Sequence, residues 1–193
     1  VFVLVDEHTG KLCLPLISSF DYMKGAEIVI IGAEDVNKTI ETLSYVWKEL
    51  GDRGATRHSL IINLGGGMVT DLGGFAASTF KRGMKYINIP TTLLAMVDAS
   101  VGGKTGINFN GLKNEIGVFS PADSVIIYTE FLKTLDMYNI LSGYAEMLKH
   151  GLISDQKHWL ELLKFNFDNI NYQELQRLVE DSVKVKENIV EMD

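Results

Sequence analysis

GGGMVTDLGG at residues 65–74 and PTTLLAMVDASVGGKTG at residues 90–106 form two glycine-rich turns with charged residues beside them. Glycine lets the backbone come close to a ligand because it has no Cβ. A turn that opens a helix also directs unpaired N–H groups and a positive dipole end at whatever binds there. With Asp71, Asp98 and Lys104 next to these turns, the pattern predicts a site for a large phosphorylated molecule.

Strand and helix patterns alternate on either side of the first turn. Short apolar, β-branched runs, typical of buried parallel strands, occupy Val1–Val5, Glu27–Ile31, Ser59–Leu64, Lys85–Ile89 and Ser124–Tyr128. Apolar residues at helical spacing occupy Lys11–Met23, Thr39–Leu50 and Met68–Phe80. This alternation predicts an α/β fold, a Rossmann-like, doubly wound and mainly parallel sheet with right-handed crossovers. Ligands of such sheets bind at the carboxyl ends of the strands, where we expect both glycine turns.

The periodicity becomes purely helical after Glu130. Three further helices are predicted, at Phe131–Ile153, Gln156–Phe165 and Tyr172–Val190, with no strand pattern between them. We therefore predict two parts, an α/β domain over residues 1–130 and the start of a helical domain over residues 131–193.

Composition excludes several classes of protein. The chain has 193 residues, of which 46% are hydrophobic and 22% charged, as in an ordinary globular protein. Its net charge of −7, without a basic block, argues against a nucleic-acid partner. Cys13 is the only cysteine, so no internal disulfide can form and a reducing compartment is expected. No apolar run is long enough to span a bilayer, and a cytoplasmic location without membrane contact is predicted.

Each motif also has a purely structural interpretation. Gly65–Gly67 follows a strand but is not a strict G-x-G-x-x-G, and a plain turn would also explain it. Gly102–Thr105 ends in Gly-Lys-Thr, but Asp98 stands where a phosphate loop needs glycine, which excludes an ATPase. The polar residues between Asn108 and Asn114 are interpreted as a solvated loop or, beside Lys104, as an anion clamp.

The segment Gly143–His150 offers a candidate metal ligand. Glu146 and Lys149 have the spacing of an ordinary exposed ion pair. Glu146 and His150 have the four-residue spacing of a metal pair, but a catalytic zinc site needs three protein ligands. For His150 we therefore favour a surface position.

Together these segments resemble the 3-dehydroquinate synthase family. The pattern is carried, in order and spacing, by Gly65–Gly74, Lys81–Gly83, Pro90–Lys104, Gly111–Asn114 and Gly143–Lys149. The resemblance extends over essentially the whole chain. Related sugar-phosphate cyclases share much of the pattern, and glycerol dehydrogenases share it more distantly.

The resemblance implies a lyase of the shikimate pathway of aromatic amino acid biosynthesis that depends on NAD and on a divalent metal, zinc or cobalt. Its substrate would be a small anionic sugar-acid phosphate, 3-deoxy-D-arabino-heptulosonate 7-phosphate, and its products 3-dehydroquinate and phosphate. The reaction would comprise oxidation, phosphate elimination, reduction and intramolecular aldol closure. A homodimer is also implied.

Site residues follow from the same resemblance. Substrate-binding or catalytic positions would be Arg82, Asp98, Lys104, Asn114, Lys149 and Lys186, with Arg82 reaching the neighbouring subunit's site. NAD contacts would be Asp6, His8, Asp35, Lys38, Gly66, Gly67, Met68, Asp71, Thr91, Thr92, Lys104, Lys113, Phe131, Leu132, Lys133 and Thr134. Glu146 would be a metal ligand, and Asp35 stands where the family usually has Glu.

One difference from the family pattern limits the activity that we expect of this chain alone. The family takes two histidine ligands from a region beyond Asp193, so we expect a fragment with much of the NAD surface but no competent metal site. Two alternatives stay open at this point. One is a related cyclase or polyol dehydrogenase on the same scaffold, and the other is a nucleotide-binding module without activity.

Overall fold

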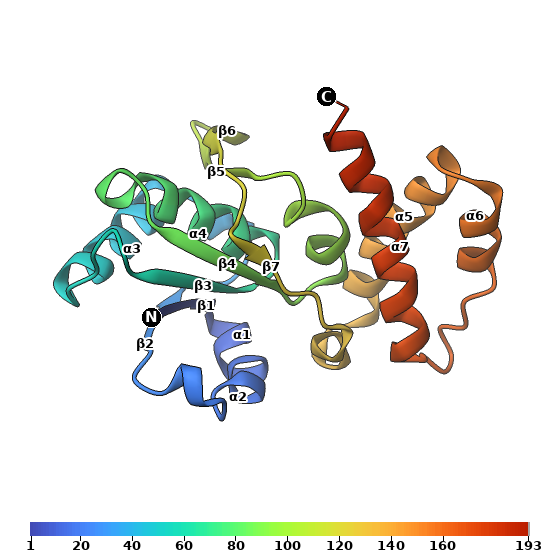
Figure 1. The fold of residues 1–193 in the computed structure, drawn as a ribbon, viewed down its shortest axis with the longest axis horizontal. Helices are drawn as coiled ribbons and strands as arrows, with labels where there is room; N and C mark the ends of the chain where they lie inside the picture. Colours follow the sequence, from blue (N-terminus) through green and yellow to red (C-terminus); the bar gives the residue numbers. More distant parts are fainter. Residues whose placement is uncertain (193) are drawn as a thin grey trace.

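A five-stranded parallel sheet organises the first two thirds of the computed structural model, which describes residues 1–192 (Figure 1). Its strands lie in the order β2-β1-β3-β4-β7, and every pairing is parallel. Their bounds are β1 Phe2–Asp6, β2 Glu27–Ile31, β3 Leu60–Gly65, β4 Lys85–Pro90 and β7 Ser124–Val125. The predicted α/β fold with a Rossmann-like parallel sheet is therefore confirmed.

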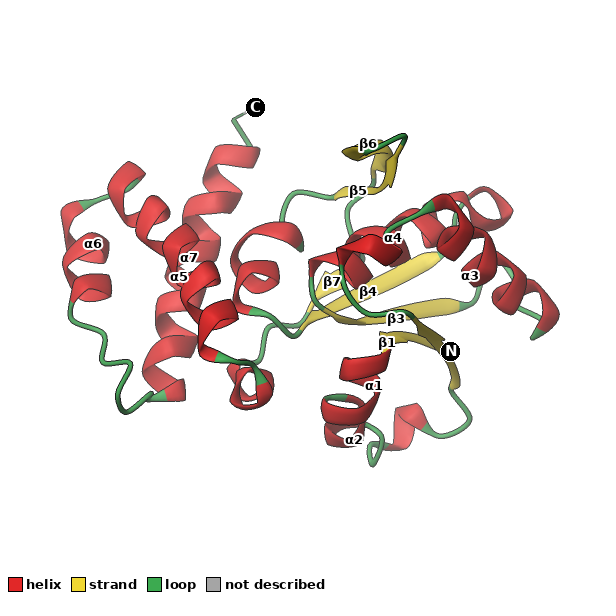
Figure 2. Cartoon of the chain, turned by 180° about the vertical axis from the view of Figure 1, so that it is seen from behind, coloured by secondary structure: helices red, strands yellow, loops and turns green. Residues whose placement is uncertain are grey.

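Both faces of this sheet are covered, which explains its uninterrupted apolar strands. In β1, Val3 and Val5 belong to one core and Phe2 and Leu4 to the other. Helices α1 (Glu7–Leu12) and α2 (Leu14–Ile17) lie on one side of the sheet, and α3 (Ile40–Asp52) and α4 (Gly67–Thr79) lie on the opposite side (Figure 2). The order of the strands reverses between β1 and β3, so the switch point lies where Asp6 and Gly65 end these strands.

Helix α4 lies unusually close to the sheet because glycines face it. A Cβ at Gly73 would lie 2.0 Å from Asn63 Oδ1, and a Cβ at Gly74 would lie 2.7 Å from Thr105 Cγ2. Real Cβ atoms do not approach that closely, so these two glycines serve packing. Both lie near the middle of α4, with Gly73 against β3 and Gly74 against Thr105, which lies outside this sheet.

The C-terminal helices pack onto the end of the sheet. They are the 3₁₀ segment η5 (Thr129–Thr134), α5 (Met137–Ile153), α6 (Gln156–Leu163) and α7 (Tyr172–Val190). One core is shared by both parts, since Val3 and Met96 belong to the same cluster as Met147 and Leu178. The division near residue 130 stays a prediction. Within residues 1–192, no helix is both long and apolar enough to cross a bilayer.

Two of the predicted helices are interrupted. The helix expected over Lys11–Met23 begins earlier, because the Asp6 carboxylate caps α1 through the His8 and Thr9 amides, and it is followed by a separate α2 with Pro15 in its first turn. The helix expected over Phe131–Ile153 is broken because Leu135 is extended, and Asp136 then caps α5 through the Asn139 amide.

The interpretation of the segment between Asn108 and Asn114 as a loop was wrong. It belongs to an antiparallel hairpin of β5 (Lys104–Phe109) and β6 (Leu112–Phe119). Asn110 and Gly111 form its tip with φ of 50° and 78°, the conformation that the tightest hairpin turns require. Asn-Gly between two strand-like runs was the signal for this hairpin in the sequence.

The position expected for the second glycine turn was also wrong. A π-helical turn, η4 (Ala95–Ala99), separates Gly102 and Gly103 from the end of β4. Both glycines have positive φ, 94° and 69°, and they lead into β5 rather than into a helix. This turn therefore offers no helix N-terminus to a ligand.

Candidate active site at the carboxyl edge of the sheet

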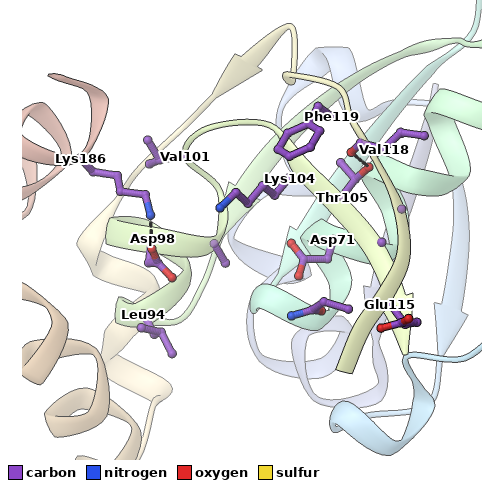
Figure 3. A pocket seen from close by; sticks show the side chains of 14 residues that line it. Asp71, Leu94, Asp98, Val101, Lys104, Thr105, Glu115, Val118, Phe119 and Lys186 are labelled. Atoms are coloured by element: carbon purple, nitrogen blue, oxygen red, sulfur yellow. Dashed lines mark hydrogen bonds and ion pairs between the residues drawn. The ribbon is translucent and has the colours of Figure 1, made fainter. Parts of the chain in front are cut away.

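A pocket of about 490 Å³ lies between α4, the η4 turn, the β5–β6 hairpin and α7 (Figure 3). Predicted site residues from four separate segments line it, namely Asp71, Asp98, Lys104, Asn114 and Lys186. Glu115 and Phe119 of β6 line it too and were missed, because the hairpin that carries them was not predicted. The fold thus brings together most of the residues expected to bind the substrate.

An ion pair joins the two sides of this pocket. Lys186 Nζ of α7 lies 2.5 Å from Asp98 Oδ1 of the η4 turn. Lys104 extends its side chain toward this pair (Figure 3). Within residues 1–192, Lys104 has no ion-pair partner, so its positive charge is available to an anion in the pocket.

Lys38 forms a buried connection between three segments. Its side chain is only 5% exposed, and its Nζ donates to Asp71 Oδ2 of α4 at 2.6 Å and to Asn114 Oδ1 of β6. Burial raises the pKa of the Asp71 carboxyl, and the nearby Lys38 ammonium opposes this. Because of this connection, the hairpin and α4 hold a defined position beside the pocket.

Asp35 and Lys113 form a second polar cluster at the far side of the hairpin. Lys113 Nζ lies 3.0 Å from Asp35 Oδ2, which also accepts from Asn108 Nδ2 at 3.2 Å. Burial tends to raise the pKa of Asp35, but these two donors outweigh it and the pKa is lowered. Both residues line a separate shallow pocket with Thr39.

The N-terminus of α4 has the features of an anion site. Gly66 is its extended N-cap and offers no side-chain cap to the first-turn amides. A Cβ at Gly66 would lie 3.0 Å from Thr92 Cγ2, and a Cβ at Gly67 would lie 3.2 Å from Ala99 Cβ, so the segment is closely packed. Thr91 is buried, and Met68 is half-buried against the core that α3 and α4 share. Unpaired amides at the start of a 13-residue helix favour a phosphate group.

Other residues assigned to NAD lie outside the main pocket. The Asp6 carboxylate accepts from two amides of α1, and His8 is exposed on the same turn. Phe131 and Leu132 are buried in the core. Lys133 forms an ion pair with Glu130 at 2.5 Å, and exposed Thr134 donates to the Phe131 carbonyl. Any contact of these last four residues with a ligand remains a prediction.

Glu146 lies on α5 where this helix crosses the chain after β4. The crossing is close because of Gly143, where a Cβ would lie 2.5 Å from the Leu94 amide nitrogen. Glu146 Oε1 contacts Lys149 Nζ and lies 3.4 Å from His150 Nε2.

The surface position favoured for His150 was wrong. Its side chain is 1% exposed, and burial lowers the pKa of its imidazole. The sequence did contain a signal for this burial. One buried stripe of the helix is formed by Ile140, Gly143, Met147 and His150.

The residues near Glu146 do not complete a metal site. Within residues 1–192, the one group of three possible ligands is His158, Glu161 and Asp181. Arg177 already pairs with Glu161 at 2.8 Å and with Asp181 at 3.5 Å, and Lys184 lies 3.1 Å from Asp181. These carboxylates are therefore neutralised by cations and are poor ligands for a metal.

Arg82 and Lys149 do not line the main pocket. Arg82 is exposed and lines a different surface hollow with Tyr86 and Asp123. The turn that carries Arg82 has three consecutive positive φ angles, 49° at Lys81, 67° at Arg82 and 111° at Gly83. This backbone conformation is strained at the two residues that are not glycine. Strain of this kind is typical of functional segments.

Comparison with known proteins agrees with this geometry. Residues 28–142 match the family described as 3-dehydroquinate synthase N-terminal, and residues 143–193 match 3-dehydroquinate synthase C-terminal. A 3-dehydroquinate synthase of Parabacteroides distasonis is 54% identical over all of this chain and 55% of its own length. That of Clostridium tetani is 44% identical over 81% of this chain and 43% of its own length.

A solved structure has the same fold. It is 2-epi-5-epi-valiolone synthase of Streptomyces hygroscopicus with NAD⁺ and Zn²⁺ bound, with a TM-score of 0.87 and 29% identity over 96% of this chain and 53% of that one. The chain spans about half the length of the curated relatives it matches. It belongs to the 3-dehydroquinate synthase family.

Proposed function

We propose that this sequence, in a chain as long as its relatives (hereafter the full-length form), converts 3-deoxy-D-arabino-heptulosonate 7-phosphate to 3-dehydroquinate and phosphate. The observation that carries this proposal is the pocket in which Asp71, Asp98, Lys104, Asn114 and Lys186 meet. Membership of the 3-dehydroquinate synthase family supports it. Shikimate-pathway function in the cytoplasm follows as part of the same proposal.

NAD would bind across the switch point of the sheet. The amides at Gly66 and Gly67 would hold its pyrophosphate at the N-terminus of α4. Asp35, Lys38 and Asp71 would hold the remainder through polar contacts along the hairpin side. Bound there, NAD would supply reversible hydride transfer to and from the substrate.

A divalent metal, zinc or cobalt, would bind Glu146. The carboxylate fits this role, because Lys149 and His150 both approach its Oε1. Its other oxygen, Oε2, is left for a bond to the metal. A metal held there would supply Lewis-acid chemistry, lowering the pKa of the substrate hydroxyl at the carbon to be oxidised.

The cationic side chains would bind the anionic parts of the substrate. Lys104 and Lys186 lie in the pocket, and Lys149 lies one turn from Glu146. These charges would stabilise the departing phosphate dianion in a protein that is acidic overall. The departing phosphate would itself take the proton made acidic by the neighbouring ketone.

A homodimer would complete the site. Arg82 is exposed on a strained turn away from its own pocket. In a second copy it would reach the substrate, as the resemblance to the family implies.

Turnover by the full-length form tests the proposed reaction. We expect phosphate release from the seven-carbon acid phosphate without net accumulation of NADH, because the hydride is returned. Sedoheptulose 7-phosphate and glycerol serve as control substrates. Cyclisation of the first, or steady NADH formation from the second, would instead support a related cyclase or a polyol dehydrogenase.

We expect the 193-residue chain alone to bind NAD but not to catalyse the reaction. Within residues 1–192, no group of three possible ligands includes Glu146, and catalytic zinc needs at least three.

A further inference from the structure

His150 is a buried histidine with no evident structural use. Its side chain is 1% exposed, and within residues 1–192 neither ring nitrogen has a hydrogen-bond partner. A buried polar group without a partner costs free energy that an apolar side chain would not. The presence of a histidine at such a position therefore calls for an explanation beyond packing.

The proposed metal ligand lies close to this ring. His150 follows Glu146 by one turn of α5, and its Nε2 lies 3.4 Å from Glu146 Oε1. The structure records no hydrogen bond at this separation, so the contact proposed below requires one of the two side chains to rotate. The imidazole carries an N–H at Nε2 in one of its tautomers.

Two donors then approach the same oxygen. Lys149 Nζ also contacts Glu146 Oε1, from the exposed side of the helix, whereas His150 approaches from the buried side. Neither contact involves Oε2, which has no hydrogen bond or ion pair within residues 1–192 and could therefore bind a metal. Carboxylates that bind metals are commonly held in this way by hydrogen bonds to the other oxygen.

We propose that His150 is a positioning residue, whose Nε2–H holds Glu146 Oε1 so that Oε2 faces the metal. This inference rests on the proposed function, because it requires Glu146 to be a metal ligand. Lys149 also donates to Glu146 Oε1, but 55% of its side chain is exposed, whereas the His150 ring is buried and has fewer conformations open to it.

Equilibrium binding of Co²⁺ to the full-length form tests this proposal. His150→Phe keeps a flat ring but removes the donor, whereas His150→Gln keeps an N–H at a similar reach. We expect His150→Phe to lower Co²⁺ affinity by roughly 10- to 100-fold and to change the visible absorption of the bound ion. His150→Gln should restore most of the affinity. The melting temperature of each metal-free variant shows whether it is folded.

The outcomes separate the two proposals. If the unmodified protein binds Co²⁺ and His150→Phe binds it equally well, the role of His150 is refuted and the metal site stands. If His150→Phe leaves Co²⁺ affinity unchanged and His150→Gln lowers it, His150 serves packing only. If the unmodified protein binds no Co²⁺, or Glu146→Gln binds it unchanged, both proposals fall.

Discussion

Glu146→Gln in the full-length form is expected to abolish tight metal binding and to reduce turnover by roughly a thousandfold or more, because a bound metal contributes several kcal/mol to such a step. The amide keeps the shape of the side chain but is a far weaker ligand than a carboxylate. Zinc content after dialysis and phosphate release together measure the effect. NAD binding should change little, since Glu146 does not line the pocket beside α4.

Glu180→Gln is the matched control for this variant. Glu180 is exposed on α7, and its carboxylate accepts one hydrogen bond, from Gln176, among the residues that the structure describes. It should leave both zinc content and turnover unchanged. Full zinc occupancy in Glu146→Gln would contradict the assignment of Glu146 as a ligand.

Lys38→Met should destabilise the 193-residue chain by about 2–4 kcal/mol, because removing one member of a buried ion pair leaves the other charge uncompensated. The charge left without a partner is that of Asp71, whose side chain is 19% exposed. Because water reaches part of this carboxylate, we expect a smaller loss of stability than for a fully buried pair. The contact with Asn114 of β6 is lost as well, so the hairpin should loosen. Urea unfolding measures the first effect, and hydrogen exchange in β5 and β6 measures the second.

Lys48→Met provides the control for Lys38→Met. Lys48 also pairs with an aspartate, Asp52, but on the exposed surface of α3, where ion pairs contribute little. The double variant Lys38→Met with Asp71→Leu should recover part of the lost stability, because no buried charge is then left unpaired. Equal urea midpoints for Lys38→Met and Lys48→Met would show that the buried pair does not organise the site.

The central strands were predictable because they are buried on both faces. The run Val1–Val5 needs no alternation, and all five residues of β1 are buried. The predicted limits Glu27–Ile31 also agree with β2, although this edge strand leaves Ile30 half exposed. Helix α7 matched its prediction because its apolar stripe is regular and long. Periodicity failed where capping decides the boundary, as at Asp6 and Asp136.

The site was predictable only in part. The resemblance supplied Asp98, Lys104, Asn114 and Lys186, and the structure brings them to one pocket. It could not show that Lys38 is buried between Asp71 and Asn114, because those three residues are far apart in sequence and meet only through the hairpin. The burial of His150 was predictable from the helical stripe but was not predicted, and its approach to Glu146 became visible only in α5 of the structure.

We infer that a nucleotide site lies at the carboxyl edge of this sheet, between the start of α4 and the β5–β6 hairpin. Binding at this site should not require a complete metal centre. Calorimetric titration of the 193-residue chain with NAD, first without and then with zinc, tests it directly. We expect one NAD to bind in both cases, weakened in Asp71→Asn, with no tight stoichiometric uptake of zinc. Absence of NAD binding, or one tightly bound zinc per chain, would contradict the account.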